Sequence, residues 1–251
     1  MIADTRIDRV SDVFPPRRAA RWDEHNANRR EQIVEAAIQA IQDAPDGSEP
    51  KVQDIAARAG LVRTVVYRHF NGREELNRTV QRHLVEQMYD AITAGLSLEG
   101  TIPEIITRTA AAYVDWVAAN PKLYLAATRD LGDGKPSEAA AGIDSLARSV
   151  MSVVGFAAEL VARDVVVDPK LLEPMVYGVI AQARGMVEHW ARTPNGALSQ
   201  KAVTATLSRS VWFQIQGFAA DLGVPLEPDV ELRALFGSAD GFLDAPADRE
   251  A

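Results

Sequence analysis

Apolar residues recur at helical spacing along almost the whole chain. In the first such run Ile33, Ala37 and Ile41 fall on one face, and Pro45 ends the pattern. One β-branched run, residues 165–167, has the composition of a strand, but three residues are too few for a sheet. The same spacing predicts helices at residues 28–44, 52–59, 63–70, 73–95, 102–119, 122–131, 137–163, 171–191 and 198–222. The chain is therefore predicted to be all-α.

Interruptions of this pattern divide the chain into segments. Residues 1–27 are polar, contain a Pro-Pro break and show no periodicity, so we expect a mobile arm there. Residues 28–76 are predicted to form a three-helix head, residues 77–236 a helical body, and residues 237–251 a disordered tail. The helix at 73–95 would be roughly 35 Å long and would connect the head to the body.

The segment 52–76 has the pattern of a helix, a sharp turn and a second helix. Gly60 follows the first helix and suits the left-handed conformation that ends many helices. In the second helix Val66 and Phe70 are four residues apart and face inward. The opposite, exposed face carries Arg63, Thr64, Tyr67 and Arg68. Such side chains add little to a core but can bind phosphates and base edges, so we interpret the segment as a DNA-binding helix-turn-helix.

The charge distribution agrees with this interpretation. The net charge is −8, but residues 51–82 hold seven Lys/Arg against three acids, a balance of +4. Residues 91–251 have a balance of −7, so the basic stretch coincides with the motif. In the N-terminal arm Arg17, Arg18 and Arg21 could follow a DNA groove, and a solvated tail with incidental charge is the alternative.

Composition excludes several other classes of protein. There is no cysteine, which removes disulfides, thiolate metal sites and cysteine nucleophiles. We find no secretory leader and no apolar run of membrane-spanning length, and we expect a cytoplasmic protein. There is no Gly-rich phosphate loop and no nucleophile elbow, so we expect neither an enzyme nor a cofactor. No metal site is expected either, because none of the histidines has a partner at metal-ligand spacing: His25, His69, His83 and His189.

The order of the motif residues resembles the TetR family of one-component transcriptional regulators, over residues 29–92. The resemblance rests on Asp54-Ile55-Ala56, Ala59-Gly60-Leu61, Val66-Tyr67-Arg68-His69-Phe70 and Arg73-Glu74-Glu75-Leu76. It implies a homodimer that binds a pseudo-palindromic double-stranded DNA operator, with a small-molecule effector pocket in each body. The residues it places at the DNA are Lys51, Arg63, Thr64, Val65, Tyr67, Arg68, His69 and Arg73.

Within this set the resemblance assigns separate roles. Arg63 and Thr64 occupy base-reading places, whereas Tyr67, His69 and Arg73 stand where phosphates are contacted.

Three positions depart from the family pattern: Lys51 and Val62 replace hydroxyl residues, and Val65 replaces a polar one. A lost cap costs about 1 kcal/mol, so we expect packing to hold the recognition helix.

The body offers candidates for an effector pocket and for a dimer interface. Arg184 lies in an apolar run and could meet a ligand anion or an acid across an interface. The pocket candidates are Tyr113, Trp116, Tyr124, Met151, Phe156, Met175, Tyr177 and Arg184, with ordinary core packing as the alternative. The interface candidates are Gly178, Ala181, Gly185, Trp212, Phe213 and Phe218 on the last two long helices, with close packing inside one chain as the alternative.

These observations favour a ligand-responsive transcriptional regulator, expected to act as a repressor, that binds DNA as a homodimer. The effector is expected to be a small apolar molecule in the body, and the helix at 73–95 is the expected lever. The alternatives are a helical ligand-binding or scaffold protein with an altered DNA head, and a helical enzyme acting on an apolar substrate.

Overall fold

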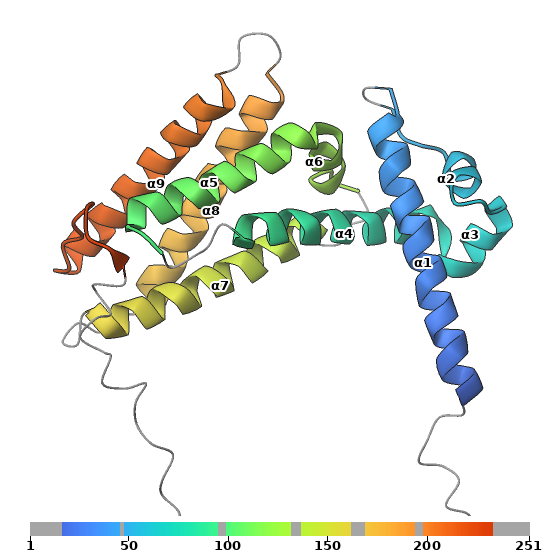
Figure 1. Cartoon of the computed structure of the whole chain (residues 1–251), viewed down its shortest axis with the longest axis horizontal. Helices are drawn as coiled ribbons and strands as arrows, with labels where there is room; N and C mark the ends of the chain where they lie inside the picture. Colours follow the sequence, from blue (N-terminus) through green and yellow to red (C-terminus); the bar gives the residue numbers. More distant parts are fainter. Residues whose placement is uncertain are drawn as a thin grey trace, which may run out of the picture. The chain divides into compact units, whose positions relative to one another are not determined.

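The computed structural model describes residues 17–45, 48–94, 99–131, 137–161, 169–193 and 198–232. These residues are helical apart from turns and one isolated antiparallel bridge between Thr101 and Glu231, which confirms the predicted all-α class (Figure 1). The helices are α1 (Arg17–Asp43), α2 (Val52–Arg58), α3 (Arg63–His69), α4 (Gly72–Ala94), α5 (Ile102–Ala119), α6 (Pro121–Ala127), α7 (Glu138–Val161), α8 (Pro169–Ala191) and α9 (Gln200–Asp221).

The chain divides into two compact units, Met1–Val80 and Gln81–Ala251, which we call the head unit and the body unit. Helix α4 contributes residues to both. The predicted tail at 237–251 and residues 1–16 of the predicted arm lie outside the described residues.

Helix α1 begins at Arg17, eleven residues before the predicted start at Asn28, so the arm prediction is wrong for residues 17–27. Asn28 and Glu31, whose spacing in the sequence resembles a helix-capping box, lie within α1 and do not cap its first turn. Residues 17–27 are rich in Ala and Arg, which have high helix propensity, and no proline follows Pro16 in this stretch.

The core of the head unit is built by α1, α2 and α3, which pack against one another (Figure 1). Ile33 of α1, Val66 of α3, Phe70 after it and Leu76 of α4 are almost completely buried. Val66 and Phe70 face inward, as the four-residue spacing predicts.

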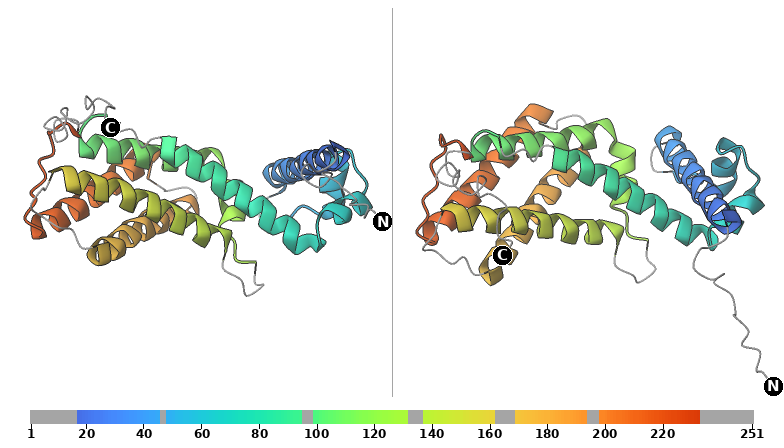
Figure 2. Two further views of the ribbon diagram at one scale, coloured as in Figure 1. Left: turned by 90° about the horizontal axis from the view of Figure 1, so that it is seen from below. Right: turned by 60° about the horizontal axis from the view of Figure 1, so that its bottom comes forward.

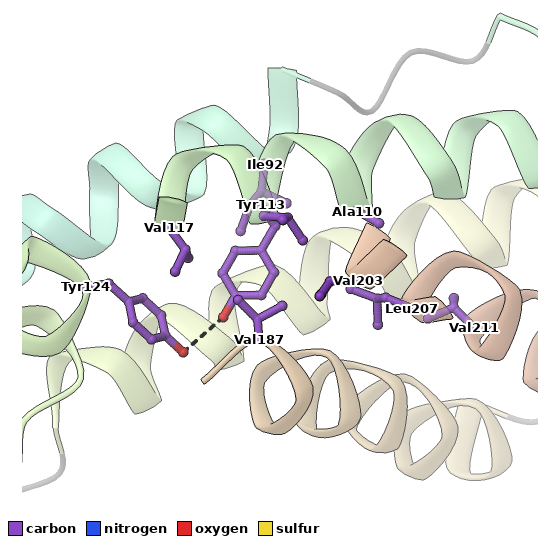
Figure 3. Packing of buried hydrophobic residues seen from close by; sticks show 10 residues of the cluster. Ile92, Ala110, Tyr113, Val117, Tyr124, Val187, Val203, Leu207 and Val211 are labelled. Atoms are coloured by element: carbon purple, nitrogen blue, oxygen red, sulfur yellow. Dashed lines mark hydrogen bonds between the residues drawn. The ribbon is translucent and has the colours of Figure 1, made fainter. Parts of the chain in front are cut away.

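The body unit has two apolar clusters. Helices α5, α8 and α9 lie side by side, and α7 packs along α8 (Figures 1 and 2). The larger cluster is centred on α5, α8 and α9 and includes Val117, Val187 and Leu207 (Figure 3). The smaller one joins α7 and α8 through Ala147 and Val176.

The part of α4 in the body unit makes polar contacts in addition to burying Leu84 and Ile92. The buried Gln81 side-chain amide donates to the carbonyl of Ala126 in the last turn of α6 at 3.0 Å and to that of Arg129 just after α6 at 2.8 Å. Tyr89 hydrogen-bonds Ser149 of α7 at 2.8 Å. Nearby, α4 and α7 approach closely.

None of the described helices combines the length and the apolar character needed to cross a membrane.

Candidate functional site

Helices α2 and α3 form a helix-turn-helix whose turn is closed by main-chain hydrogen bonds. Gly60 has φ of 65°, in the left-handed region, as predicted from its position after α2. Its N–H donates to the Ala57 carbonyl at 3.0 Å, and the Leu61 N–H donates to the Ala56 carbonyl at 2.8 Å. This is the Schellman arrangement, and it sets the direction in which the chain leaves α2.

The N-termini of both helices lack the usual hydroxyl caps. Lys51 precedes α2, and its ammonium group cannot accept a hydrogen bond, but the Asp54 carboxylate accepts the Lys51 N–H at 3.2 Å. Asp54 therefore supplies the reciprocal half of a capping box. Val62 precedes α3 with 65% of its surface exposed and makes no capping hydrogen bond.

Helix α3 presents a polar outer face. Arg63, Thr64, Tyr67 and Arg68 are all exposed, whereas Val65 is half-buried and Val66 is buried. Arg63 lies along Tyr67: its Nη2 is 3.3 Å from the Tyr67 hydroxyl, and its guanidinium carbon is 5.2 Å from the ring centroid. This contact places the Arg63 guanidinium beside the Tyr67 ring on the outside of the helix.

The arginines of the basic stretch differ in how their charges are balanced. Arg58 pairs with Asp43 at 2.8 Å, and Arg73 pairs with Glu49 at 3.1 Å. Among the described residues no carboxylate pairs with Arg63 or Arg68. Within α2 and α3, the arginines without an acidic partner therefore lie on α3. Their positive charge is available to bind an anionic polymer.

Two of the predicted DNA-contacting residues are engaged within the head unit. Arg73 donates to the Pro50 carbonyl at 2.8 Å as well as pairing with Glu49, so it ties the segment before α2 to the start of α4. Its phosphate contact stays a prediction and requires the guanidinium to leave Glu49. His69 is half-buried at the last position of α3, and its phosphate contact also stays a prediction. Lys51 is exposed.

The corner between α3 and α4 is held by Arg30 of α1 and Glu75 of α4. The Arg30 guanidinium donates to the His69 carbonyl and pairs with Glu75 at 2.8 Å. The other Glu75 oxygen accepts the Asn71 N–H at 2.7 Å. Neither contact was predicted from the sequence. The spacing of Asn71 and Glu74 indicates a capping box that uses Glu74, whereas the structure has Glu75 in that role. Helix α4 begins at Gly72 with φ of 90°, which shifts the carboxylate that reaches back by one residue.

The hydrogen bond from the Asn71 N–H, followed by the one from Arg30, lowers the pKa of Glu75 below its ordinary value of 4.5. The carboxylate is therefore ionised throughout the neutral range, and the corner holds a charged pair.

Comparisons with known proteins agree with this geometry. The chain is 33% identical over 112 residues to an uncharacterised HTH-type transcriptional regulator of Mycobacterium tuberculosis. The matched residues make up 43% of this chain and 45% of that protein. The match thus spans less than half the length of that relative. The fold matches a TetR-family transcriptional regulator from Streptomyces coelicolor with a TM-score of 0.60, 22% identity, and coverage of 88% of this chain and 91% of that one. The chain has the fold of the TetR-family transcriptional regulators.

A further structure of similar fold is that of the transcriptional regulator FadR from Bacillus subtilis in complex with stearoyl-CoA. It matches with a TM-score of 0.51 and 16% identity, over 72% of this chain and 96% of that one. No family model matches the sequence. The structural likeness confirms the fold that the resemblance implied.

In the body unit, Tyr113 and Tyr124 form a buried pair within the larger cluster. Their hydroxyl groups are 3.2 Å apart, and their rings meet edge to face with centroids 6.4 Å apart (Figure 3). Burial, with Tyr124 beside it, raises the pKa of Tyr113 well above its ordinary value of 10.0. Burial also raises the pKa of Tyr124, while the hydrogen bond from Tyr113 opposes that shift. Both side chains are therefore neutral phenols.

The predicted pocket residues divide between the two apolar clusters. Trp116 packs at the edge of the larger cluster with the tyrosine pair. Met151, Met175 and Tyr177 pack in the smaller one, and the Tyr177 hydroxyl donates to Asp144 at 2.9 Å. Arg184 is exposed, and it acts electrostatically on the tyrosine pair by lowering both pKa values. The side chain of Phe156 lies outside the described ones.

The predicted interface residues also divide. Gly178, Ala181 and Gly185 are exposed along one face of α8, and Phe213 of α9 is 61% exposed. Trp212 is buried within the chain, and Phe218 is half-buried against the smaller cluster. The place of these residues in a dimer interface stays a prediction. Among the described residues no three His, Asp or Glu side chains are grouped to hold a metal ion.

Proposed function

We propose that this protein is a transcriptional regulator that binds a pseudo-palindromic DNA operator as a homodimer, acts as a repressor, and responds to a small apolar effector held in the body unit. The observation that carries the proposal is the outer face of α3, where Arg63 and Arg68 have no acidic partner among the described residues. The M. tuberculosis relative is described as an HTH-type transcriptional regulator, which supports the same function here.

At the DNA, the recognition helix α3 would lie in the major groove. Arg63 can donate two parallel hydrogen bonds to the O6 and N7 atoms of guanine, and the Thr64 methyl group can meet a thymine methyl. Tyr67 and Lys51 would bind phosphates, which fixes the register without reading the bases. Two such helices in a dimer would read half-sites roughly 34–36 Å apart.

The dimer would form through the exposed face of α8 and α9. Small residues at Gly178, Ala181 and Gly185 allow a second helix to approach closely. The exposed Phe213 ring supplies apolar area on the neighbouring helix, the kind of side chain that anchors an interface.

An apolar effector fits the composition of the body unit. The FadR structure with the same fold holds stearoyl-CoA, a molecule with a long apolar chain. In this chain the partly buried Trp116, Met186 and Trp190 border the larger cluster. An effector that binds one arrangement of these helices better than another would shift the population of DNA-binding molecules by its difference in affinity.

Binding to DNA selected from a random pool tests the proposal. Arg63→Ala should weaken specific binding by roughly tenfold or more, since a good base contact contributes about 1–3 kcal/mol. Tyr67→Ala should weaken binding about equally to all sequences, since it removes a phosphate contact. Arg58→Ala is the matched control, because Arg58 lies in the same helix-turn-helix and already pairs with Asp43 at the end of α1. The affinity of the wild-type protein should also fall steeply with added salt. Unchanged specific binding in the Arg63→Ala and Tyr67→Ala double variant would refute the assignment of α3.

A further inference from the structure

The recognition helix has little intrinsic support. Helix α3 is seven residues long, far shorter than isolated helices that are stable in water. Val62 provides no side-chain cap at its start, and Phe70 at its end has already returned to extended backbone, with φ of −134° and ψ of 129°. Apolar burial of Val66 and Phe70 fixes which face of α3 is inside, but two side chains four residues apart leave the tilt of the helix poorly determined.

Arg30 of α1 contacts three successive parts of the corner at the end of α3. One guanidinium nitrogen donates to the His69 carbonyl, at the last residue of the helix. The guanidinium carbon lies 4.2 Å from the centre of the Phe70 ring. A second nitrogen pairs with Glu75 at 2.8 Å, and Glu75 in turn accepts the Asn71 N–H.

We propose that Arg30 is a positioning residue for DNA recognition, which fixes the direction of α3 relative to α1 and α4 and so orients Arg63 and Tyr67 without touching the DNA. The inference rests on the proposed DNA-binding function. Arg30 is separated from His69 and Glu75 by 39 and 45 residues, so it joins the first helix to the far end of the motif.

The planar fork of the guanidinium is what this role requires. It can donate to a carbonyl with one nitrogen and to a carboxylate with another while its flat face covers a ring. A lysine at this position would keep the positive charge and could still pair with Glu75. Its single ammonium group cannot hold the carbonyl, the carboxylate and the ring in one fixed geometry.

The surroundings of Arg30 also argue against a direct phosphate contact. Its charge is balanced by Glu75, whose carboxylate would be left unpaired if the guanidinium turned to DNA. A phosphate ligand contributes to the salt dependence of binding, whereas a positioning residue does not. The two roles are therefore separable by measurement.

The test compares Arg30→Lys and Arg30→Ala with Arg58→Lys. Arg58 is a matched control, because its side chain is 38% exposed, as that of Arg30 is, and it pairs with a carboxylate at the same 2.8 Å distance. Its partner, Asp43, lies away from the α3–α4 corner. Each variant is titrated with the selected DNA at several salt concentrations, at a temperature where circular dichroism shows it folded.

We expect Arg30→Lys to have a lower thermal midpoint than the wild type, because a charged hydrogen bond within the head unit is lost. Where it is still fully folded it should bind the selected DNA roughly tenfold more weakly, because α3 is no longer held in one orientation. Its salt dependence should match that of the wild type. Arg58→Lys should change affinity by no more than about twofold, as exposed ion pairs usually do. If Arg30→Ala does not fold, the Lys variant still carries the test.

Three results would count against this role. Wild-type affinity in Arg30→Lys would show that the fork is not needed. A salt slope reduced by about one in Arg30→Ala would identify Arg30 as a phosphate ligand. A wild-type protein with no specific, salt-dependent binding would refute the proposed function itself, and the inference with it.

Discussion

The head unit and the body unit are stabilised in different ways. In the head unit α2 and α3 have seven residues each, and polar side chains of α1 hold their ends. Gln32 donates to the Ala59 carbonyl at 2.8 Å at the end of α2, and Arg30 donates to the His69 carbonyl at the end of α3. In the body unit α5, α7, α8 and α9 have 18 to 24 residues and pack mainly through two apolar clusters.

The difference matches what each unit is proposed to do. Hydrogen bonds and ion pairs are directional, so the polar contacts that α1 adds to the apolar core of the head unit help to hold α3 in one orientation, which base reading requires. Apolar packing is less directional, and cores can exchange side chains of similar volume while keeping their fold.

Removing an apolar anchor of the head unit should have the largest effect. Phe70 is 1% exposed and also lies under Arg30, so Phe70→Ala leaves a cavity and an uncovered guanidinium. We expect a loss of about 3–5 kcal/mol in the free energy of unfolding of the head unit. Hydrogen exchange followed by mass spectrometry should show the loss of protection in residues 17–80 only.

Val62→Ala serves as the control for Phe70→Ala. Val62 is an exposed apolar residue at the other end of α3, and shortening it should change stability by no more than about 0.5 kcal/mol. If Phe70→Ala lowered the protection of the body unit as much as that of the head unit, the two units would unfold together. The contrast between them would then be lost.

The tyrosine pair gives a medium-sized test in the body unit. Tyr113→Phe or Tyr124→Phe alone leaves one buried hydroxyl without its partner, at a cost of about 1–3 kcal/mol. The double variant removes both polar groups and should be close to the wild type, because two phenyl rings fill the same space. Urea denaturation of the four proteins measures the coupling directly.

A double variant that is less stable than both single variants would contradict this account of the pair. It would mean that the hydroxyl groups contribute stability beyond their mutual hydrogen bond, and that polar contacts matter in the body unit as they do in the head unit.

Local signals in the sequence were sufficient to predict most helices. Helix α5 spans Ile102–Ala119 as expected, since Pro121 stops it, and Thr101 with Glu104 forms a capping box at its start. The turn at Gly60 was predicted for the same reason, because a glycine after a helix is a local feature. The outer face of α3 follows from spacing alone.

Features that depend on distant residues could not be predicted this way. The contact of Arg30 with His69 and Glu75 joins residues about forty positions apart, and nothing in the local pattern of α1 distinguishes Arg30 from Arg29. The division of the pocket residues between two clusters depends on which helices pair, which periodicity does not encode. The start of α1 at Arg17 was missed because polar residues with high helix propensity carry no apolar period.

The smallest expected effect is the pH dependence of the α3–α4 corner. Folding lowers the pKa of Glu75 below 4.5, through the Asn71 N–H and Arg30. The folded head therefore binds this proton more weakly than the unfolded chain does. The stabilisation from the carboxylate is complete above pH 4.5 and is lost as the pH falls through the lowered value. The Asn71 amide signal in NMR spectra should titrate with a midpoint below 4.5 in the wild type. That titration should disappear in Glu75→Gln and persist in Glu74→Gln, which changes the exposed neighbouring carboxylate. If the titration were lost in Glu74→Gln instead, Glu74 would be the residue that caps α4. The Arg30–Glu75 link, on which the contrast between the head unit and the body unit partly rests, would then be unsupported.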